Sequence, residues 1–437
     1  MEKVLLLLFL ILFAGRFIWR YILQHINIRY LKSRGKEIPQ VFQGIIDEST
    51  LSKMVDYAVE NSRLESKENL VDDIIELAVL FLFLPAFVSA IVGLKMHFIW
   101  QALIFFGTFA AIGGIIGIPF DLYENFVLEK KYGFSTITWR IWITDLIKSM
   151  IISAILMIII ISAFMSFINY LPTSWWFWAW IFFTLFEIVM LWLYPVLIAP
   201  LFNKYEPIKN EQLKEKITAL MDKVGLKAKG IFEVDEGKRS KHTNAYFTGI
   251  GKTKRIVLYD TLLASHSTDE ILAVLAHEIG HWKKKHILKQ LMFMIPASLV
   301  LLYSVYLILG WPLLYTAFGL QVTLYAGLFL VSLYLSSAGF FLSPIGAAIM
   351  RRYEREADRI ACDLTGTSAP MIDALKRLAK DNLANLHPHP LYVWFYYSHP
   401  PLIERIEYLQ IMDYEKVNPA TWNSPAPAGG GSTKQEI

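Results

Sequence analysis

Seven long apolar runs constrain this chain more than any other feature of its sequence. Each is close to or longer than the roughly 20 residues that a helix needs to cross a bilayer. Inside lipid the backbone must satisfy its own hydrogen bonds, so each run is predicted to be a helix of a predominantly α-helical integral membrane protein. The runs lie at Val4–Leu23, Ile75–Leu94, Phe98–Phe120, Ile147–Tyr170, Trp175–Pro200, Leu288–Trp311 and Leu324–Met350.

The composition agrees with a membrane protein. Of 437 residues, 55% are hydrophobic and only 18% are charged, whereas soluble proteins carry about 25% charged residues. The net charge of +4 is too small to indicate a nucleic-acid partner and is better explained by loops that face an anionic leaflet. The single cysteine, Cys362, excludes an intrachain disulfide and a zinc site built on several cysteines.

The first apolar run could instead be a cleaved signal peptide. Against this alternative, the run is long, lacks a small-residue cleavage site and carries Arg16 and Arg20 in its second half. We therefore expect a retained membrane helix whose two arginines extend to one interface. Beyond Lys3 and Lys95, nearly all lysines and arginines fall on the face with the polar segments after spans five and seven. The positive-inside rule makes that face cytosolic.

The spans divide the chain into five parts. Residues 1–202 hold five spans with cytosolic loops, 203–287 form a first polar part, 288–350 hold two spans, 351–415 form a second polar part, and 416–437 are predicted to be a flexible tail. The first polar part shows an amphipathic helix and several strands. They are predicted at Asn210–Gly225, Ile231–Val234, and Asn244–Thr248 paired with Arg255–Tyr259 in a hairpin around Gly249-Ile250-Gly251.

The first polar part also contains a His-Glu-x-x-His motif on a predicted helix. Ser267 and Glu270 form a capping box at the start of this helix. His277 and His281 are four residues apart, so both imidazoles project from one face and can supply two ligands to zinc. Glu278 lies beside the first ligand, where it can act as a general base toward water. The alternative is an exposed helical turn whose histidines bind nothing.

A third ligand is expected in the charged run Arg351–Asp358, which follows the last span. The pattern alone leaves Glu354, Glu356 and Asp358 as candidates, and a solvated helix with no ligand is the alternative. Glu354 and Asp358 are four residues apart and share a face. One could therefore bind the metal while the other orients a ligand histidine through a hydrogen bond.

Motifs along nearly the whole chain, to about Tyr414, resemble the CAAX prenyl proteases of the a-factor-converting-enzyme type, which are integral-membrane zinc metalloproteases. The matching segments are Asp121–Tyr123, Glu129–Phe134, Lys238–Ser240, Asn244–Phe247, Lys254–Leu262, His277–Trp282, Arg352–Glu354 with Ala357-Asp358, and Ser398–Leu402. The resemblance implies seven helices around a large water-filled chamber and a zincin-like cytosolic protease domain with a small sheet.

The resemblance also assigns roles to residues. It implies one zinc ion on His277, His281 and Glu354, with Asp358 hydrogen bonded to a ligand. This chain departs from the family at Arg355-Glu356, where an aromatic residue and an amide are more frequent. The resemblance also implies an edge strand that binds substrate, formed by Asn244, Ala245, Tyr246 and Phe247. It further implies that two side chains, His399 and Arg405, donate hydrogen bonds to the oxyanion. His286, His387 and His389 are interpreted as surface or interface residues.

The activity implied is removal of the last three residues of prenylated Cys-a-a-X proteins, or cleavage of other membrane-associated peptides, sometimes with a second, N-terminal cut. The membrane would be the endoplasmic reticulum or nuclear envelope in a eukaryote and the inner membrane in a bacterium. One alternative is a bacterial quality-control protease of the related HtpX type, although such chains are shorter with fewer spans. Another is a non-catalytic membrane protein with structural zinc, which would not need Glu278. No oligomeric state is predicted.

Overall fold

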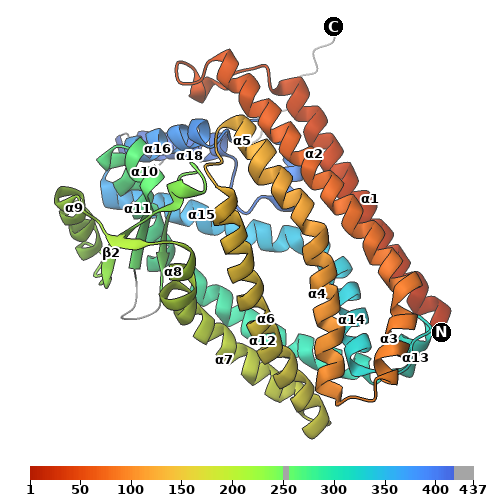
Figure 1. Ribbon diagram of the computed structural model, residues 1–437. Coiled ribbons are helices and arrows are strands. Elements are labelled where there is room, and N and C mark those ends of the chain that lie inside the picture. The colour runs from red at the N-terminus through yellow and green to blue at the C-terminus, as the bar shows by residue number, and fades with distance from the viewer. Residues whose placement is uncertain (250–254, 418–437) are drawn as a thin grey trace, which may run out of the picture.

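Long helices make up most of the molecule, and a small α/β part lies at one end of them (Figure 1). The computed structural model describes residues 1–249 and 255–417. The predicted class, a helical membrane protein with a small sheet, is confirmed. The tail 416–437 lies outside the described residues except for Lys416 and Val417 at the end of the last helix, and Ile250 and Gly251 of the predicted hairpin turn lie outside them as well.

In the described part, six helical segments are long and apolar enough to cross a membrane. Three of them contain a π-helical turn within the described residues. One of these turns, Val79–Phe83, ends two residues before Pro85, and another, Tyr194–Ile198, contains Pro195. The missing N–H of a proline interrupts regular α-helical hydrogen bonding. The segments are α1 (Glu2–Arg34), α2 (Glu48–Ala78) with η2 (Val79–Phe83) and α3 (Leu84–Gly93), α4 (Phe98–Tyr123) with η3 (Glu124–Leu128) and α5 (Glu129–Tyr132), α6 (Trp139–Tyr170), α7 (Trp175–Leu193) with η4 (Tyr194–Ile198) and α8 (Ala199–Phe202), and α12 (His286–Leu309).

The seventh predicted span, Leu324–Met350, is a bent pair of helices that are together long and apolar enough to be one broken span. The chain forms α14 (Leu324–Phe340) and α15 (Ser343–Thr365), which are bent by 54°. Pro344 lies in the first turn of α15, where its missing N–H costs no hydrogen bond, and its ring disfavours an unbent continuation from α14. As a result, the apolar end of the predicted span and the Glu354 segment belong to one helix.

Arg16 and Arg20, which were expected to extend to one interface, are paired with carboxylates of α2 within the protein. Arg16 Nη2 lies 3.0 Å from Asp73 Oδ1 and 2.6 Å from Glu76 Oε2, and Arg20 donates to Asp73 as well. The side chains of Arg16 and Asp73 are buried. A buried cation in a membrane helix is far less costly when a carboxylate partner accompanies it, and α2 supplies that partner to α1.

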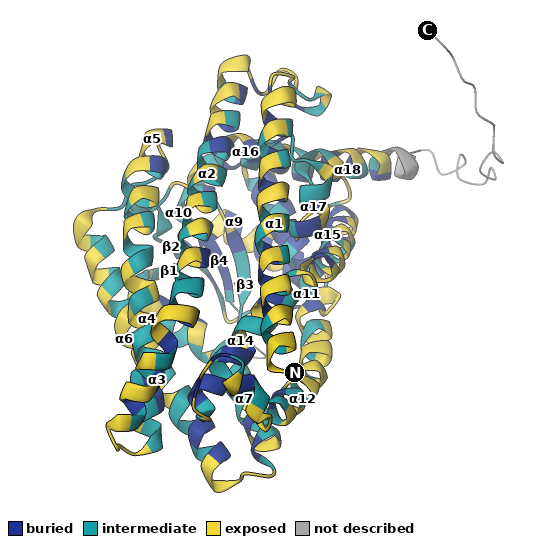
Figure 2. Cartoon of the chain, turned by 90° about the vertical axis from the view of Figure 1, so that its right-hand side faces the viewer, coloured by how far each residue is buried: buried dark blue, intermediate teal, exposed yellow. Residues whose placement is uncertain are grey.

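The membrane helices form a ring, because they contact one another in a closed order: α1 with α2, α2 with α4, α4 with α6, α6 with α7, α7 with α12, α12 with α14, and α14 with α1. In the most apolar stretch of each of the six segments, only 6% to 22% of the residues are buried. Figure 2 shows exposed residues along α1, for example. On α6 the exposed residues Ile147, Ile151, Ile155 and Ile158 follow one helical stripe, as expected for a face toward lipid.

The buried apolar side chains gather at the two ends of the ring. One core joins α1, α3, α4, α6, α7, α12, α13 (Pro312–Thr316) and α14 at the end far from the sheet. The others lie around the sheet and the helices at the opposite end. The helices that contribute to these cores include α9 (Glu211–Asp222), α10 (Asp260–Ser265), α11 (Thr268–Lys283), α16 (Ala369–Asp381) and α18 (Leu402–Val417), together with parts of α2 and α15. α17 (Pro390–Tyr396) contacts α15 and α1.

Among the described residues the sheet has four strands in the order β1-β2-β4-β3. They are β1 (Tyr205–Pro207), β2 (Gly230–Val234), β3 (Ala245–Thr248) and β4 (Arg255–Tyr259). β4 is parallel to β2 and antiparallel to β3, which confirms the predicted pairing of the two hairpin strands. β3 is therefore an edge strand, and Ala245 packs with Ala276 and Ile279 of α11 in one core.

Candidate active site

α11 starts where the sequence predicts and holds the His-Glu-x-x-His motif in regular helix. The hydroxyl of Ser267 accepts a hydrogen bond from the Glu270 N–H, and the Glu270 carboxylate accepts one from the Ser267 N–H. Arg377 of α16 donates to the same carboxylate at 2.9 Å. This capping box fixes the first turn of the helix, and the motif follows two turns later on its buried side.

His277, His281 and Glu354 meet in a triangle of ligand atoms. His277 Nε2 and His281 Nε2 lie 3.2 Å apart, and each lies 3.2 Å from one oxygen of Glu354. Glu354 comes from α15, whereas the histidines come from α11. Among the described residues this is the group that could hold a metal ion. The structure thus brings Glu354, and not Glu356, to the two histidines.

The donor set fits zinc. Tetrahedral zinc with bonds of about 2.0–2.1 Å holds its ligand atoms about 3.3–3.4 Å apart. The two Nε2 atoms are 3.2 Å apart, and His277 and His281 each lie 3.2 Å from a different oxygen of Glu354, Oε2 and Oε1. Glu354 Oε2 is buried and faces His277 Nε2 at 3.2 Å, as expected for two ligand atoms directed at a shared cation. Burial lowers the pKa of His277, but hydrogen bonds to Asp358 and Glu354 outweigh it and raise the pKa to about 9. Without metal, His277 therefore carries a proton that metal binding must displace.

Asp358 contacts the ring nitrogen of His277 that points away from the triangle, and Arg405 binds Asp358. Asp358 Oδ1 lies 2.8 Å from His277 Nδ1, which directs Nε2 of that ring into the triangle. Arg405 donates Nε and Nη2 to the two oxygens of Asp358 at 2.9 and 2.7 Å. Because Arg405 is buried and two of its nitrogens are engaged in this way, the geometry favours a positioning role for it over donation to an oxyanion.

His399 and Glu278 face the same triangle. His399 Nε2 lies 3.3 Å from Glu354 Oε1, while much of its ring is exposed. The Ser398 hydroxyl lies 2.9 Å from His399 Nδ1, and donation to that nitrogen leaves the hydrogen on Nε2. Burial raises the pKa of Glu278, which moves this carboxylate toward the range of an effective general base.

His286 is the residue that the sequence interpretation missed. It was interpreted as a surface or interface residue; it is buried, which excludes the surface, and its Nδ1 lies 3.0 Å from Nδ1 of His281. Its other nitrogen lies 3.3 Å from Glu356 Oε2. The available signal was its distance of five residues from a ligand histidine. That spacing does not place it on the ligand face of one continuous helix, and a turn between α11 and α12 is needed to bring it there.

A close approach of α11 and α15 holds the triangle together. A Cβ atom added to Gly280 would lie 2.8 Å from Ala357 Cα and 2.9 Å from its carbonyl oxygen. Real Cβ atoms do not approach backbone this closely, so only glycine fits between the helices here. This contact sets the distance between His281 and Glu354.

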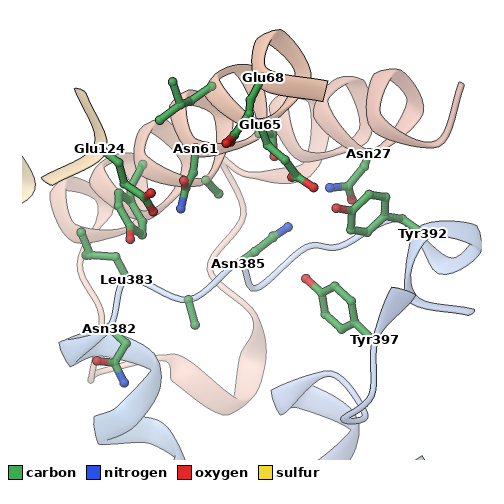
Figure 3. A pocket seen from close by; sticks show the side chains of 15 residues that line it. Asn27, Asn61, Glu65, Glu68, Glu124, Asn382, Leu383, Asn385, Tyr392 and Tyr397 are labelled. Carbon is green, nitrogen blue, oxygen red and sulfur yellow. The ribbon is translucent and has the colours of Figure 1, made fainter. Parts of the chain in front are cut away.

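A hollow of about 360 Å³ adjoins the edge strand and α11. Its lining includes Ala245, the first residue of β3, and Asn244 just before it. It also includes Val274, one turn before His277, and Leu402 at the start of α18. A more polar hollow of about 410 Å³ lies elsewhere, between α1, α2 and the α16–α17 connection (Figure 3). Glu65, Glu68 and Glu124 face that second hollow, and the described residues that line it do not include the metal-binding triangle.

Comparisons with known proteins agree with this geometry. Residues 27–204 match the family model described as CAAX prenyl protease N-terminal, five membrane helices, and residues 207–413 match peptidase family M48. The five-helix match argues against the shorter HtpX-type alternative, and the peptidase match argues against a non-catalytic protein. The boundary between the two matches lies where the chain leaves α8 and enters the sheet.

Relatives match over most of the chain. CAAX prenyl protease 1 of Saccharomyces cerevisiae is 33% identical over 423 residues, which cover 89% of this chain and 92% of that protein. The human CAAX prenyl protease 1 homolog is 31% identical over 354 residues, or 72% and 74% of the two chains. The crystal structure of S. mikatae Ste24p superposes with a TM-score of 0.85 at 32% identity, covering 92% of this chain and 99% of that one. The chain therefore belongs to the CAAX prenyl protease family, the integral-membrane zinc metalloendopeptidases of peptidase family M48.

Proposed function

We propose that this protein removes the last three residues of prenylated Cys-a-a-X proteins, or cuts related membrane-associated peptides, with one zinc ion per chain. The observation that carries the proposal is the buried triangle of His277, His281 and Glu354 with Glu278 on the same helix. The relatives' names supply the substrate class. A lipid-modified peptide is held at the bilayer, and a site attached to a ring of membrane helices meets it there.

Zinc bound at the triangle would lower the pKa of a water molecule and polarise the scissile carbonyl. Glu278 takes the proton of the attacking water and passes it to the leaving amine. His399, with its hydrogen on Nε2, donates to the oxygen that becomes negative in the transition state. Asp358 holds His277 in the tautomer that leaves Nε2 free, and Arg405 holds Asp358.

Asn244–Phe247 binds the extended substrate by strand addition. β3 is at the edge of the sheet, and an edge strand offers unpaired backbone groups to a peptide. The adjoining hollow beside Ala245 and Val274 can receive an apolar side chain of the substrate. We place the site on the cytosolic side from the distribution of lysine and arginine, in the endoplasmic reticulum or nuclear envelope of a eukaryote or the inner membrane of a bacterium.

The test uses purified protein in detergent with a farnesylated Cys-a-a-X peptide and its unprenylated counterpart. Wild type should contain one zinc and release the tripeptide from the farnesylated peptide. Glu278→Gln should keep the zinc and lose at least about 10²-fold in rate, as removal of a general base predicts. Glu354→Ala should lose the zinc, whereas Glu215→Gln, an exposed glutamate on α9, should match wild type in both respects.

Two results would count against the proposal in different ways. If only the unprenylated peptide is cut, the hydrolytic chemistry stands and the substrate class is wrong. If Glu278→Gln cuts as fast as wild type, the general base has been misassigned.

A further inference from the structure

His281 has a hydrogen-bonded support of its own, made of residues that have no role in the chemistry above. His286 Nδ1 lies 3.0 Å from His281 Nδ1, and His286 Nε2 lies 3.3 Å from Glu356 Oε2. The His286 ring is 2% exposed and stacks on Tyr353 at 4.1 Å with an interplanar angle of 7°. The ring is therefore held in one orientation between a ligand histidine and a carboxylate.

The direction of these hydrogen bonds follows from the ligand role of His281. To offer a lone pair at Nε2, a neutral His281 must carry its hydrogen on Nδ1. That hydrogen points to His286 Nδ1, which must then accept and carry its own hydrogen on Nε2. The ionised carboxylate of Glu356 can only accept, so it favours this tautomer of His286.

The reverse arrangement does not suit a metal ligand. If His286 carried its hydrogen on Nδ1, it would donate to His281, and the hydrogen of a neutral His281 would sit on Nε2, facing Glu354 and His277. Glu356 works against this arrangement, because it would leave two acceptors, its own oxygen and His286 Nε2, facing each other at 3.3 Å. The chain of acceptors and donors thus selects the tautomer that binds metal.

We propose that His286 and Glu356 form a positioning pair that fixes the tautomer and ring orientation of His281, in the way that Asp358 serves His277. His286 comes from α12, whereas both carboxylates, Glu356 and Asp358, come from α15, the helix that also supplies the ligand Glu354. The backbone of the α11–α12 turn is consistent with this placement. Lys285 has a left-handed conformation (φ 54°, ψ 41°), which is uncommon for a residue with a side chain and directs the chain so that His286 lies under His281.

The inference rests on the proposed zinc site, and its test is zinc affinity, measured on metal-free protein in detergent by competition with a chromophoric chelator. His286→Phe keeps a ring on Tyr353 but removes the acceptor, and it should weaken zinc binding about 10–100-fold, the usual effect of losing a hydrogen-bond partner of a ligand. His286→Asn keeps an acceptor oxygen near the position of Nδ1 and should recover most of this loss. Glu356→Gln should weaken binding in the same direction.

Lys289→Met is the matched control. Lys289 Nζ lies 3.8 Å from the same Glu356 oxygen, so this variant removes a charge beside Glu356 and leaves the two hydrogen bonds in place. It should bind zinc as wild type does. The unfolding temperature of each metal-free variant is recorded, so that a loss of fold is recognised; if His286→Phe does not fold, Glu356→Gln carries the test.

Equal zinc affinity of folded His286→Phe and wild type would overturn the positioning pair and leave the proposed function intact. Equal losses for His286→Phe and His286→Asn would also overturn it, because they would trace the effect to packing alone. If wild type binds no zinc, the proposed function and the positioning pair fall together.

Discussion

Among the residues of the site, Arg405 is the one whose removal should lower the free energy of unfolding most. Its partner Asp358 is fully buried and bound through two nitrogens. Arg405→Ala should destabilise the metal-free protein by roughly 3–5 kcal/mol, because it removes the cation that binds both oxygens of a buried carboxylate and leaves only His277 to compensate it. Arg355→Ala is the control. The pair of Arg355 with Glu404 is exposed, at 3.7 Å, so its removal should change stability by less than about 1 kcal/mol. Similar unfolding midpoints for the two variants would contradict this account.

At the level of whole helices, the close contact of α11 with α15 at Gly280 sets the geometry of the metal-binding triangle. Gly280→Ala should separate the two helices, since the added Cβ would overlap the backbone of Ala357. We expect a lower unfolding temperature and weaker zinc binding, because His281 and Glu354 move apart together with the helices. Gly113→Ala on α4 is the control, since a Cβ there meets nothing within 4 Å and alanine favours helix. The idea fails if Gly280→Ala binds zinc with wild-type affinity.

The capping box of α11 makes stability depend on pH. Burial raises the pKa of Glu270, but hydrogen bonds from Ser267 and Arg377 outweigh it and keep the pKa below its ordinary value. A lowered pKa stabilises the folded state above the unfolded value of about 4.3, and this stabilisation disappears as the pH falls through the folded value. Glu270→Gln should therefore cost about 1 kcal/mol at pH 7. Unfolding midpoints of both metal-free proteins should converge in acid, and a constant difference would contradict the prediction.

On the scale of the whole molecule, Arg16 joins distant helices of the ring. It binds Asp73 and Glu76 on α2, and its Nη1 lies 3.4 Å from Ser336 Oγ on α14. Arg16→Met should lower the unfolding temperature in detergent and cost roughly 3–5 kcal/mol, since it leaves buried carboxylates with less compensation. Arg34→Met is the control, because Arg34 and Glu37 are both exposed. If Arg16→Met unfolds at the temperature of Arg34→Met, the network does not hold the ring together.

The sequence alone predicted the features that depend on spacing along one segment. Length and apolar composition predicted the membrane helices, and the capping box with two histidines four residues apart predicted α11 and its ligand face. These signals are local, because a helix brings residues i and i+4 together wherever it lies. The pairing of β3 with β4 was predicted for a similar reason, since a short loop joins two strands of alternating pattern.

Only the tertiary structure decided what depends on how the elements meet. The charge pattern of Arg351–Asp358 by itself offered three carboxylates, of which the family resemblance indicated Glu354, and the packing of α15 on α11 through Gly280 brings Glu354 to the histidines. The bend before Pro344 turns α15 toward the histidines, and the left-handed Lys285 brings His286 under His281. Arg16 is buried because α2 supplies its carboxylates. In each case the partner is far away in the chain, and residue spacing carries no information about which distant surfaces come into contact.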